Sequence, residues 1–359
     1  MDEPGGCPAV ADAWPRERDA SLMRAAVFKG DGVVALEDVP EPKVEADDDV
    51  VIDVEACGIC GTDLQILNVP PGHPADAGVV MGHELVGRIA ALGANGAAAG
   101  LRLGQRVTVD PDPKCGVCGP CRAGRPASCE NVRALGIFRD GALASRMKAP
   151  ADAVFPLSDD PPTGIAALIE PLACVVNGVN RANPRPGESA VIFGAGAIGC
   201  LFLAMFKAAG ASPVIVVEPQ HARGSVAMEV GADAVVHPDA VADRVGELRG
   251  AGADIVVDAV GTQFGNAVEH AALGGRIVLF GQNQTARPAV HQYSITEKSL
   301  TVLGSYITAF TFPTAIRLVE NGTLNLGPIV THTLPLERVT EGLDLLRSGG
   351  ATKVVITPA

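Results

Sequence analysis

Polar and apolar residues alternate in the first part of the chain. In residues 49–57 (DVVIDVEAC), apolar Ile52 and Val54 alternate with acidic Asp53 and Glu55. A period of two residues is typical of a half-buried β-strand. Further strand patterns, bounded by Gly or Pro, cover residues 84–92 and 106–109. The first part of the chain is therefore predicted to be rich in β-structure.

After about residue 174, short apolar strands alternate regularly with helical patterns. The predicted strands cover residues 189–193, 213–217, 234–236, 254–259, 276–280 and 301–304. The predicted helices cover residues 197–209, 220–230, 239–249 and 265–273. Such alternation predicts an α/β fold with a doubly wound parallel sheet. From about residue 305 the pattern predicts two helices and a closing strand over 353–357.

The length of 359 residues allows two domains, each with its own core. Residues 1–22 are rich in Pro and charged residues and lack the apolar centre of a signal peptide, so we expect a disordered extension. No apolar run reaches the roughly 18 residues of a membrane span. The net charge of −13 argues against nucleic acid as a partner and leaves no basic patch for a membrane surface.

The chain contains nine cysteines and no export signal, which indicates a reducing, cytoplasmic compartment. Four of them follow the spacing C-x2-C-x2-C-x7-C: Cys115, Cys118, Cys121 and Cys129. Four thiolates at this spacing can close a tetrahedron around zinc with no vacant position, which predicts a structural site. Disulfides and an iron–sulfur cluster are the alternatives.

A glycine-rich turn follows the predicted strand 189–193 and opens a helix. Gly194 allows a tight turn, Gly196 lets the backbone approach a pyrophosphate, and Gly199 lets helix and strand pack closely. The free N–H groups of the helix then face the phosphates. The turn predicts a dinucleotide site, and a strand–helix turn without a ligand is the alternative.

Glu218 ends the next predicted strand, 19 residues beyond Gly199. A carboxylate there can accept hydrogen bonds from the ribose hydroxyls of NAD and would repel the 2′-phosphate of NADP. Arg223 lies nearby, and its guanidinium could serve such a phosphate. We therefore expect NAD and keep NADP as the alternative.

A second set of possible zinc ligands is dispersed. Cys60 follows a predicted strand, His83 and Glu84 open another, and Glu170 lies near the change in pattern. A thiolate, an imidazole and a carboxylate would hold zinc and leave one position for water or an alcohol. Each residue alone is equally compatible with a structural role, and the spacing of the four residues in the sequence does not show that they form one site.

The motifs GICGTD (58–63), GHE (82–84), the four-cysteine loop, EPL (170–172) and GAGAIG (194–199) occur in this order. Together they resemble the zinc-containing medium-chain alcohol dehydrogenases, over nearly the whole chain from Met23. EPL and the glutamate after the histidine look like the branch of sorbitol-type polyol and threonine dehydrogenases. The resemblance implies a GroES-like catalytic domain over 23–174 and 308–359, and a Rossmann domain that binds NAD over 175–307. It also implies a homo-oligomer, either a dimer or a tetramer.

The same resemblance assigns roles to individual residues. It makes Cys60, His83 and Glu84 ligands of a catalytic zinc, with Glu170 as a direct or water-mediated fourth. Cys57 and Cys174 lie outside the motifs and are expected to be core thiols. Further cofactor contacts are implied at these positions: Ile198, Glu218, Arg223, Phe280, Gly281, Gln282, Ser305 and Tyr306.

In the family, a hydroxyl at the position of Thr62 passes the substrate proton outward, and a carboxylate at Asp63 orients the zinc-bound histidine. The family's relay histidine is replaced here by Gln65, which takes up no proton near neutral pH. His73 on the neighbouring loop and direct transfer to solvent are the two possible substitutes.

The predicted function is hydride transfer between a secondary alcohol and NAD, with two zinc ions per chain. The branch favours polyols, sugars, cyclitols or hydroxy amino acids as substrates. An NADP-dependent ketone reductase is one alternative. A zinc-stabilised nucleotide-binding regulator without turnover is the other.

Overall fold

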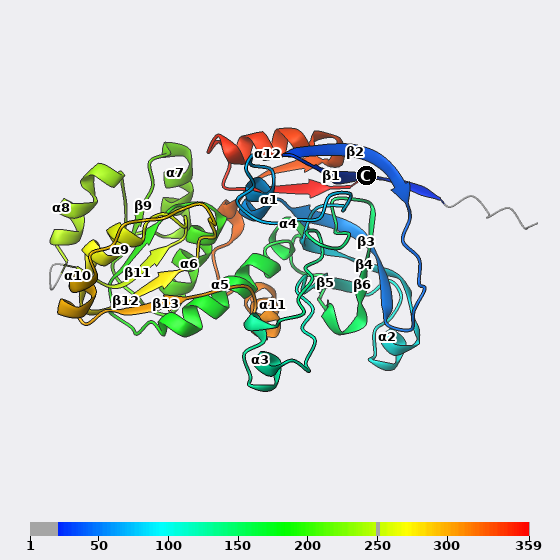
Figure 1. The fold of residues 1–359 in the computed structure, drawn as a ribbon, viewed down its shortest axis with the longest axis horizontal. Helices are drawn as coiled ribbons and strands as arrows, with labels where there is room; N and C mark the ends of the chain where they lie inside the picture. Colours follow the sequence, from blue (N-terminus) through cyan, green and yellow to red (C-terminus); the bar gives the residue numbers. More distant parts are fainter. Residues whose placement is uncertain (1–20, 249–251, 359) are drawn as a thin grey trace, which may run out of the picture.

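The computed structural model describes residues 21–248 and 252–358, which form two large β-sheets with helix α5 between them and a separate two-stranded sheet (Figure 1). The predicted extension over 1–22 lies almost wholly outside these residues. Its last residue, Leu22, is already the first residue of strand β1 and pairs with Pro40, so the predicted boundary is wrong there. No helix of the described segments is long and apolar enough to cross a bilayer.

The first sheet has seven strands and joins the two ends of the chain. Its order is β14-β15-β3-β4-β5-β7, and β6 also pairs with β3. All pairs are antiparallel except β14 with β15. The strands are β3 (Asp49–Gly58), β4 (Glu84–Leu92), β5 (Arg106–Val109), β6 (Arg146–Pro150), β7 (Val154–Pro156), β14 (Val330–Pro335) and β15 (Lys353–Thr357).

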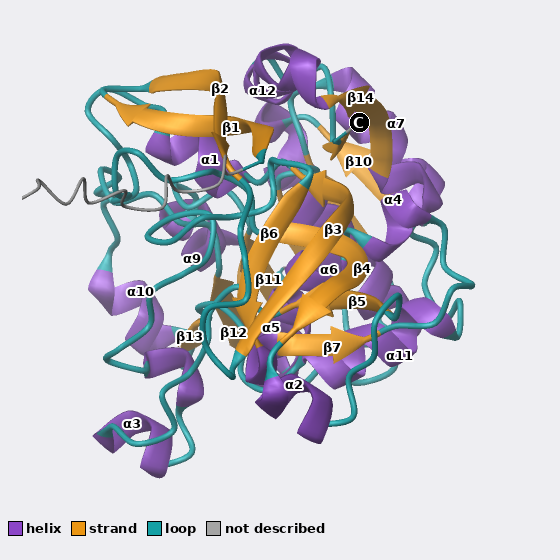
Figure 2. Cartoon of the chain, turned by 90° about the vertical axis from the view of Figure 1, so that its right-hand side faces the viewer, coloured by secondary structure: helices purple, strands orange, loops and turns teal. Residues whose placement is uncertain are grey.

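The alternation in residues 49–57 corresponds to strand β3, as predicted. Ile52 and Val54 are buried, whereas Asp53 is exposed and Glu55 is half-buried. The predicted strands over 84–92 and 106–109 are also confirmed. Figure 2 shows this sheet in front, with the hairpin of β1 (Leu22–Gly30) and β2 (Val33–Pro40) beside it. Short helices lie in the connections: α1 (Gly61–Ile66), α2 (Ala94–Ala98), α3 (Gly119–Arg122) and α4 (Thr163–Ala166).

The second sheet has six parallel strands in the order β10-β9-β8-β11-β12-β13, which confirms the predicted doubly wound sheet. Its strands are β8 (Ala190–Phe193), β9 (Val214–Val217), β10 (Ala234–Val236), β11 (Ala253–Asp258), β12 (Ala271–Leu279) and β13 (Thr301–Gly304). The helices around it are α6 (Ala197–Ala208), α7 (His221–Val230), α8 (Val241–Gly246), α9 (Phe264–His270) and α10 (Gln292–Glu297).

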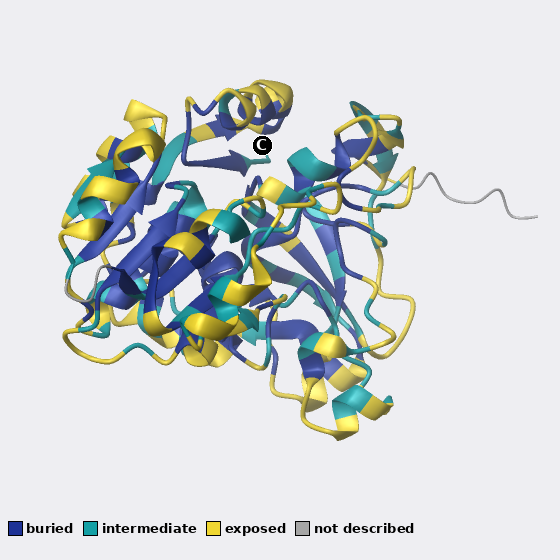
Figure 3. Ribbon diagram, turned by 60° about the vertical axis from the view of Figure 1, so that its left-hand side comes forward, coloured by how far each residue is buried: buried dark blue, intermediate teal, exposed yellow. Residues whose placement is uncertain are grey.

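Both faces of this sheet are covered, which explains its apolar strands. In β8, Ile192 faces the core shared with α5 and α6, and Val191 faces the core shared with α8 and α9. Figure 3 shows the strands buried beneath helices whose outer faces are exposed.

Two details of the predicted secondary structure are wrong. The helix predicted over 265–273 ends at His270, because Ala271 pairs with Ala253 and starts strand β12. The two helices predicted after residue 305 are α11 (Phe312–Glu320) and α12 (Val339–Arg347), but strand β14 between them was not predicted.

Helix α5 (Ile169–Ala182) joins the two sheets and packs against α6 and strand β12 of the parallel sheet. It also packs against β4 and β5 of the antiparallel sheet. The domain boundary predicted between residues 174 and 175 therefore lies inside a continuous helix.

Candidate active site

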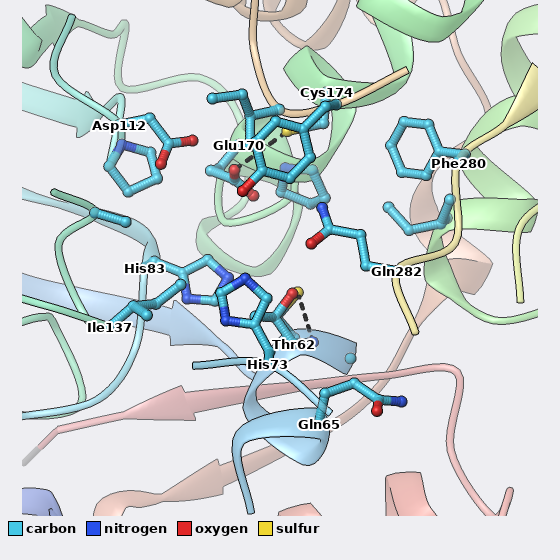
Figure 4. A pocket seen from close by; sticks show the side chains of 18 of the residues that line it. Thr62, Gln65, His73, His83, Asp112, Ile137, Glu170, Cys174, Phe280 and Gln282 are labelled. Atoms are coloured by element: carbon cyan, nitrogen blue, oxygen red, sulfur yellow. Dashed lines mark hydrogen bonds between the residues drawn. The ribbon is translucent and has the colours of Figure 1, made fainter. Parts of the chain in front are cut away.

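One cavity of about 380 Å³ lies between the two sheets, a size that suits a small ligand. Cys60 and His83 line it from the antiparallel sheet, and Ile198 and Phe280 line it from the parallel sheet. Figure 4 shows side chains from both sides facing a common space. The cavity thus brings together the two groups of residues that the motifs single out.

Cys60 lies where strand β3 passes into helix α1, and the cap of that helix fixes it. Its backbone N–H donates to Asp63 Oδ2 (2.9 Å), and the backbone N–H of Thr62 donates to Cys60 Sγ (3.4 Å). This reciprocal capping satisfies N–H groups that a helix start leaves free. It also places the Thr62 side chain on the wall of the cavity.

The pairing of β3 with β4 explains how distant residues meet. Gly58 lies opposite Glu84 in this pair, so His83 comes beside Cys60. One ligand-capable atom from each of Cys60, His83 and Glu84 lies within 4.8 Å of the others. Sulfur, nitrogen and oxygen donors at this separation fit a zinc ion.

The approach to His83 requires a glycine. Gly82 has a φ of +93°, and a Cβ there would lie 2.6 Å from Leu143 Cγ and 2.8 Å from Cys57 Sγ. A side chain would therefore push His83 away from Cys60.

His83 and Asp63 are buried, and their facing atoms have no hydrogen-bond partner in the described chain. His83 Nδ1 lies 3.8 Å from Asp63 Oδ1. Burial alone would lower the pKa of His83, but Cys60 and Asp63 raise that pKa well above its usual range. A metal held through Nε2 would fix the tautomer that points Nδ1–H toward Asp63.

Glu84 is engaged by a partner that the sequence did not reveal. Lys353 Nζ lies 2.8 Å from Glu84 Oε1 and 2.5 Å from Oε2, and it also donates to the carbonyl of Ile59 (3.0 Å). Both side chains are at most 3% exposed. Although burial opposes the ammonium form, Glu84 holds the pKa of Lys353 above its usual range.

Glu170 lies in the first turn of α5, is buried, and lines the cavity. Burial raises the pKa of Glu170 to about 8. Cys174 also lines the cavity, and its thiol donates to Glu170 Oε1 (3.4 Å). The expectation that Cys174 is a core thiol is therefore wrong, because it lies one turn after Glu170 on the same helix face. Cys57 is fully buried, as expected.

The four cysteines of the loop around α3 converge. Cys129 Sγ lies 3.5 Å from Cys115 Sγ and 3.9 Å from Cys118 Sγ. Sulfurs around a tetrahedral zinc with bonds of about 2.3 Å are about 3.8 Å apart, so these spacings fit zinc. The eight described cysteines are all free, which argues against the disulfide alternative.

Hydrogen bonds support the thiolate form of Cys115, whereas burial raises the pKa of Cys121 to about 12. Cys115 Sγ accepts from the Asn131 side-chain amide (3.3 Å) and from the backbone N–H of Cys118 (3.4 Å). The bond from Asn131 contributes most to lowering the pKa of Cys115, to about 6.

Replacing Cys118 with serine is expected to open this loop locally. One zinc per chain should be lost, and trypsin should cut after Arg122 about tenfold faster or more, because opening the loop then costs less free energy. Metal analysis and timed proteolysis check this. The matched control is Cys200→Ser, in the parallel-sheet domain. A Cys118→Ser protein that keeps its zinc and its resistance would contradict a structural metal site.

The glycine-rich turn between β8 and α6 has the shape of a phosphate cradle. Gly196 caps α6, and the space where its Cβ would lie is open. Gly199 packs so closely on the Gly194 carbonyl that a Cβ would collide with it. The helix N–H groups are thereby left accessible to a ligand.

Glu218 lies beside this turn at the end of β9 and is 8% exposed. Its Oε2 accepts from the backbone N–H of Ala195 (2.7 Å), and its Oε1 accepts from that of Gln220 (2.9 Å). The carboxylate is therefore held against the glycine-rich turn.

Arg223 points toward the C-terminal part of the chain. Its Nε donates to the carbonyl of Ala351 (2.9 Å), and its Nη2 donates to that of Leu346 (2.7 Å). These two carbonyl partners could not be predicted from the sequence.

The remaining predicted cofactor residues lie near the cavity. Phe280, Gly281, Gln282 and Tyr306 line it. Ser305 is buried, with its backbone N–H donating to the carbonyl of Leu279 (3.0 Å) and its hydroxyl lacking a partner in the described chain.

Gln65 and His73 also line the cavity. His73 Nδ1 lies 2.8 Å from the carbonyl of Pro74, and burial lowers the pKa of His73. Figure 4 shows the His73 ring beside Thr62, whereas Gln65 lies further out.

One ionisable residue that lines the cavity, Asp112, is not among the predicted site residues. Asp112 lies after β5 between two prolines, is 6% exposed, and lines the cavity. Burial raises the pKa of Asp112 to about 6. Its position in a Pro-rich loop gives no periodic signal.

Two family models match the chain. Residues 46–159 match the alcohol dehydrogenase GroES-like domain, and residues 197–321 match the zinc-binding dehydrogenase domain. The matches agree with the predicted order of a GroES-like part followed by a Rossmann part.

Full-length relatives show the same likeness. Sorbitol dehydrogenase of Bombyx mori is 32% identical over 92% of this chain and 97% of its own length. L-threonine 3-dehydrogenase of Caldanaerobacter subterraneus is 33% identical over 88% of this chain and 93% of its own length. A zinc-binding dehydrogenase structure from Sinorhizobium meliloti, bound to NADP, has a TM-score of 0.86 and 32% identity, and covers 94% of this chain and 100% of that chain.

Proposed function

The chain belongs to the zinc-containing medium-chain alcohol dehydrogenases, in the branch of sorbitol and threonine dehydrogenases, and from this premise we propose its reaction. It oxidises a secondary alcohol to a ketone with NAD, at a zinc held by Cys60 and His83 with a carboxylate from Glu84 or Glu170. A second zinc, held by the four-cysteine loop, stabilises the protein. The observation that carries this proposal is the single cavity lined by Cys60, Thr62, His83 and Glu170 together with the cofactor loop.

The residues of the cavity have distinct roles in this proposal. Zinc, when bound, supplies Lewis-acid stabilisation of negative charge on the substrate oxygen. The Thr62 hydroxyl accepts the proton from the substrate as it donates its own proton to His73 or to solvent. Asp63 holds the His83 ring, and the Gly196 turn holds the cofactor pyrophosphate. The apolar wall at Ile198 and Phe280 excludes water from hydride transfer.

Lys353 and the zinc compete for the Glu84 carboxylate in this proposal. Lys353 already pairs with both oxygens of Glu84, so Glu84 reaches zinc only by loosening that ion pair. Glu170 bonds only to the Cys174 thiol within the described chain. Glu84 nevertheless belongs to the cluster within 4.8 Å of Cys60 and His83 and Glu170 does not, so Glu84 is the candidate for direct contact and Glu170 for contact through water.

The preference for NAD rests on Glu218 and Arg223. Glu218 lies beside the glycine-rich turn, where it can accept from ribose hydroxyls. Arg223 donates to two backbone carbonyls and would have to abandon both to reach a 2′-phosphate. The NADP-bound relative keeps the alternative open to test.

Replacing Glu218 with alanine is expected to lower kcat/KM for NAD about tenfold or more, because a charged hydrogen-bond acceptor is lost. The value for NADP should fall less, so the ratio of NAD to NADP shifts toward NADP. Steady-state rates with each cofactor check this. Glu229→Ala, on the exposed face of α7, is the control. A wild-type enzyme that prefers NADP would refute the assignment.

The test of the function is metal analysis combined with NADH formation on a panel of secondary alcohols. Two zinc ions per chain and turnover on at least one polyol support the proposal. Zinc and nucleotide binding without turnover would identify a regulator instead. Faster ketone reduction with NADPH would identify a reductase.

A further inference from the structure

Asp112 has a fixed backbone and a free carboxylate. Its backbone N–H donates to Asp110 Oδ1 (3.0 Å), and its carbonyl accepts from Lys114. Within residues 21–248 and 252–358, no hydrogen-bond donor contacts the carboxylate itself. Asp112 is only 6% exposed, yet it lines the cavity on the side of Glu170 (Figure 4). A buried acceptor without a donor is costly unless a ligand supplies one.

Apart from the proposed zinc at Cys60 and His83, the cavity offers no cation to an anionic substrate. Its described lining contains neither lysine nor arginine. Lys114 Nζ, the cation nearest in sequence, donates to Thr308 Oγ1 (3.2 Å) and lies 3.6 Å from Asp110 Oδ1. A carboxylate or phosphate at the end of the substrate away from the zinc would therefore meet Asp112 without a lysine or arginine to compensate its charge.

We propose that Asp112 accepts a hydrogen bond from a second hydroxyl of the substrate, and that the substrate is an uncharged diol or polyol. This assignment rests on the proposed alcohol oxidation and narrows its substrate class. Asp112 selects the substrate by touching a part of it that does not react. Glu170, Cys60 and Thr62 act at the reacting hydroxyl, so the two ends of a diol contact separate groups.

The experiment compares alcohols that differ by one group. Butan-2-ol, butane-2,3-diol and butane-1,3-diol share a carbon skeleton, and each has a secondary hydroxyl. With the wild-type enzyme, kcat/KM for at least one diol should exceed that for butan-2-ol about tenfold, because a hydrogen bond to a charged group is gained. 3-Hydroxybutanoate, which carries an anionic group, should be oxidised more slowly than butan-2-ol.

The variants Asp112→Asn and Asp112→Ala test the residue. In Asp112→Ala the ratio of kcat/KM for the diol to that for butan-2-ol should fall to about one, because only the diol donates a second hydrogen bond to the carboxylate. Asp112→Asn keeps the side-chain shape, so its preference for the diol should lie between those of the wild type and Asp112→Ala. Asp239→Asn removes the same charge at a site that is 92% exposed and should change nothing.

Three results would overturn the assignment. Equal efficiency on the monol and both diols would remove Asp112 from substrate selection, while leaving alcohol oxidation intact. A preference for 1-aminopropan-2-ol over the diols, lost in Asp112→Ala, would show that the carboxylate binds an ammonium group. Absence of turnover on every alcohol would instead refute the proposed function, and the role of Asp112 with it.

Discussion

Replacing Cys60 with alanine is expected to lower kcat/KM at least about a thousandfold, the largest effect of any single change considered. Metal catalysis contributes several kcal/mol, and about 4 kcal/mol corresponds to three decades in rate. Cys60 is the thiol among the three donors that lie within 4.8 Å of one another, so its loss leaves His83 and carboxylates. The zinc content should fall by one per chain while the other zinc stays.

The matched control is Cys57→Ala, three positions earlier in the chain, near the end of strand β3. Cys57 is fully buried and has no place in the proposed ligand set, so this variant should keep both zinc ions and most of its activity. Steady-state kinetics and metal analysis measure both variants. Cys60→Ala with full zinc content and normal turnover would mean that the active metal lies elsewhere.

Replacing Lys353 with methionine is expected to destabilise the protein by about 3–5 kcal/mol, because it leaves the Glu84 carboxylate buried without its partner. Both side chains are at most 3% exposed, so water does not compensate. The free energy of unfolding, measured by denaturant titration after zinc removal, separates this effect from metal binding. Adding Glu84→Gln to Lys353→Met should recover part of the loss.

The control is Lys148→Met. Lys148 pairs with Glu45 (2.6 Å), but Lys148 is 28% exposed and Glu45 is 75% exposed. A pair so accessible to water contributes about 1 kcal/mol or less. Equal losses for Lys148→Met and Lys353→Met would mean that burial of the Glu84 pair does not determine its contribution.

Periodic features of the fold could be predicted from the sequence. The parallel strands are short apolar runs buried on both faces, and glycines separate them from helices. Strand β12 was misjudged at its start because Ala271 and Ala272 suit a helix as well as a strand, and only the pairing with Ala253 decides between them. Strand β14 could not be predicted because helix α12 separates it in the sequence from its partner, β15.

The site was harder to predict, because strand pairing creates it. Cys60 and His83 meet only when β3 pairs with β4, so the family resemblance, rather than spacing, assembled them. Cys174 did carry a signal, since it follows Glu170 at helical spacing. Lys353 and Asp112 carried none: each depends on where a distant segment returns to the sheet or the cavity.

Helix α5 makes the cavity sensitive to movement. It carries Glu170, packs on α6, and holds the returning chain through Asn177, whose amide donates to the carbonyls of Tyr306 (3.2 Å) and Ile307 (2.9 Å). Cys60 and His83 belong to the other sheet. Because α5 packs against both sheets, a displacement of this helix moves Glu170, while the pairing of β3 with β4 keeps Cys60 and His83 together. The distance of the Glu170 carboxylate from Cys60 and His83 would then depend on how closely the two sheets approach each other around the cavity.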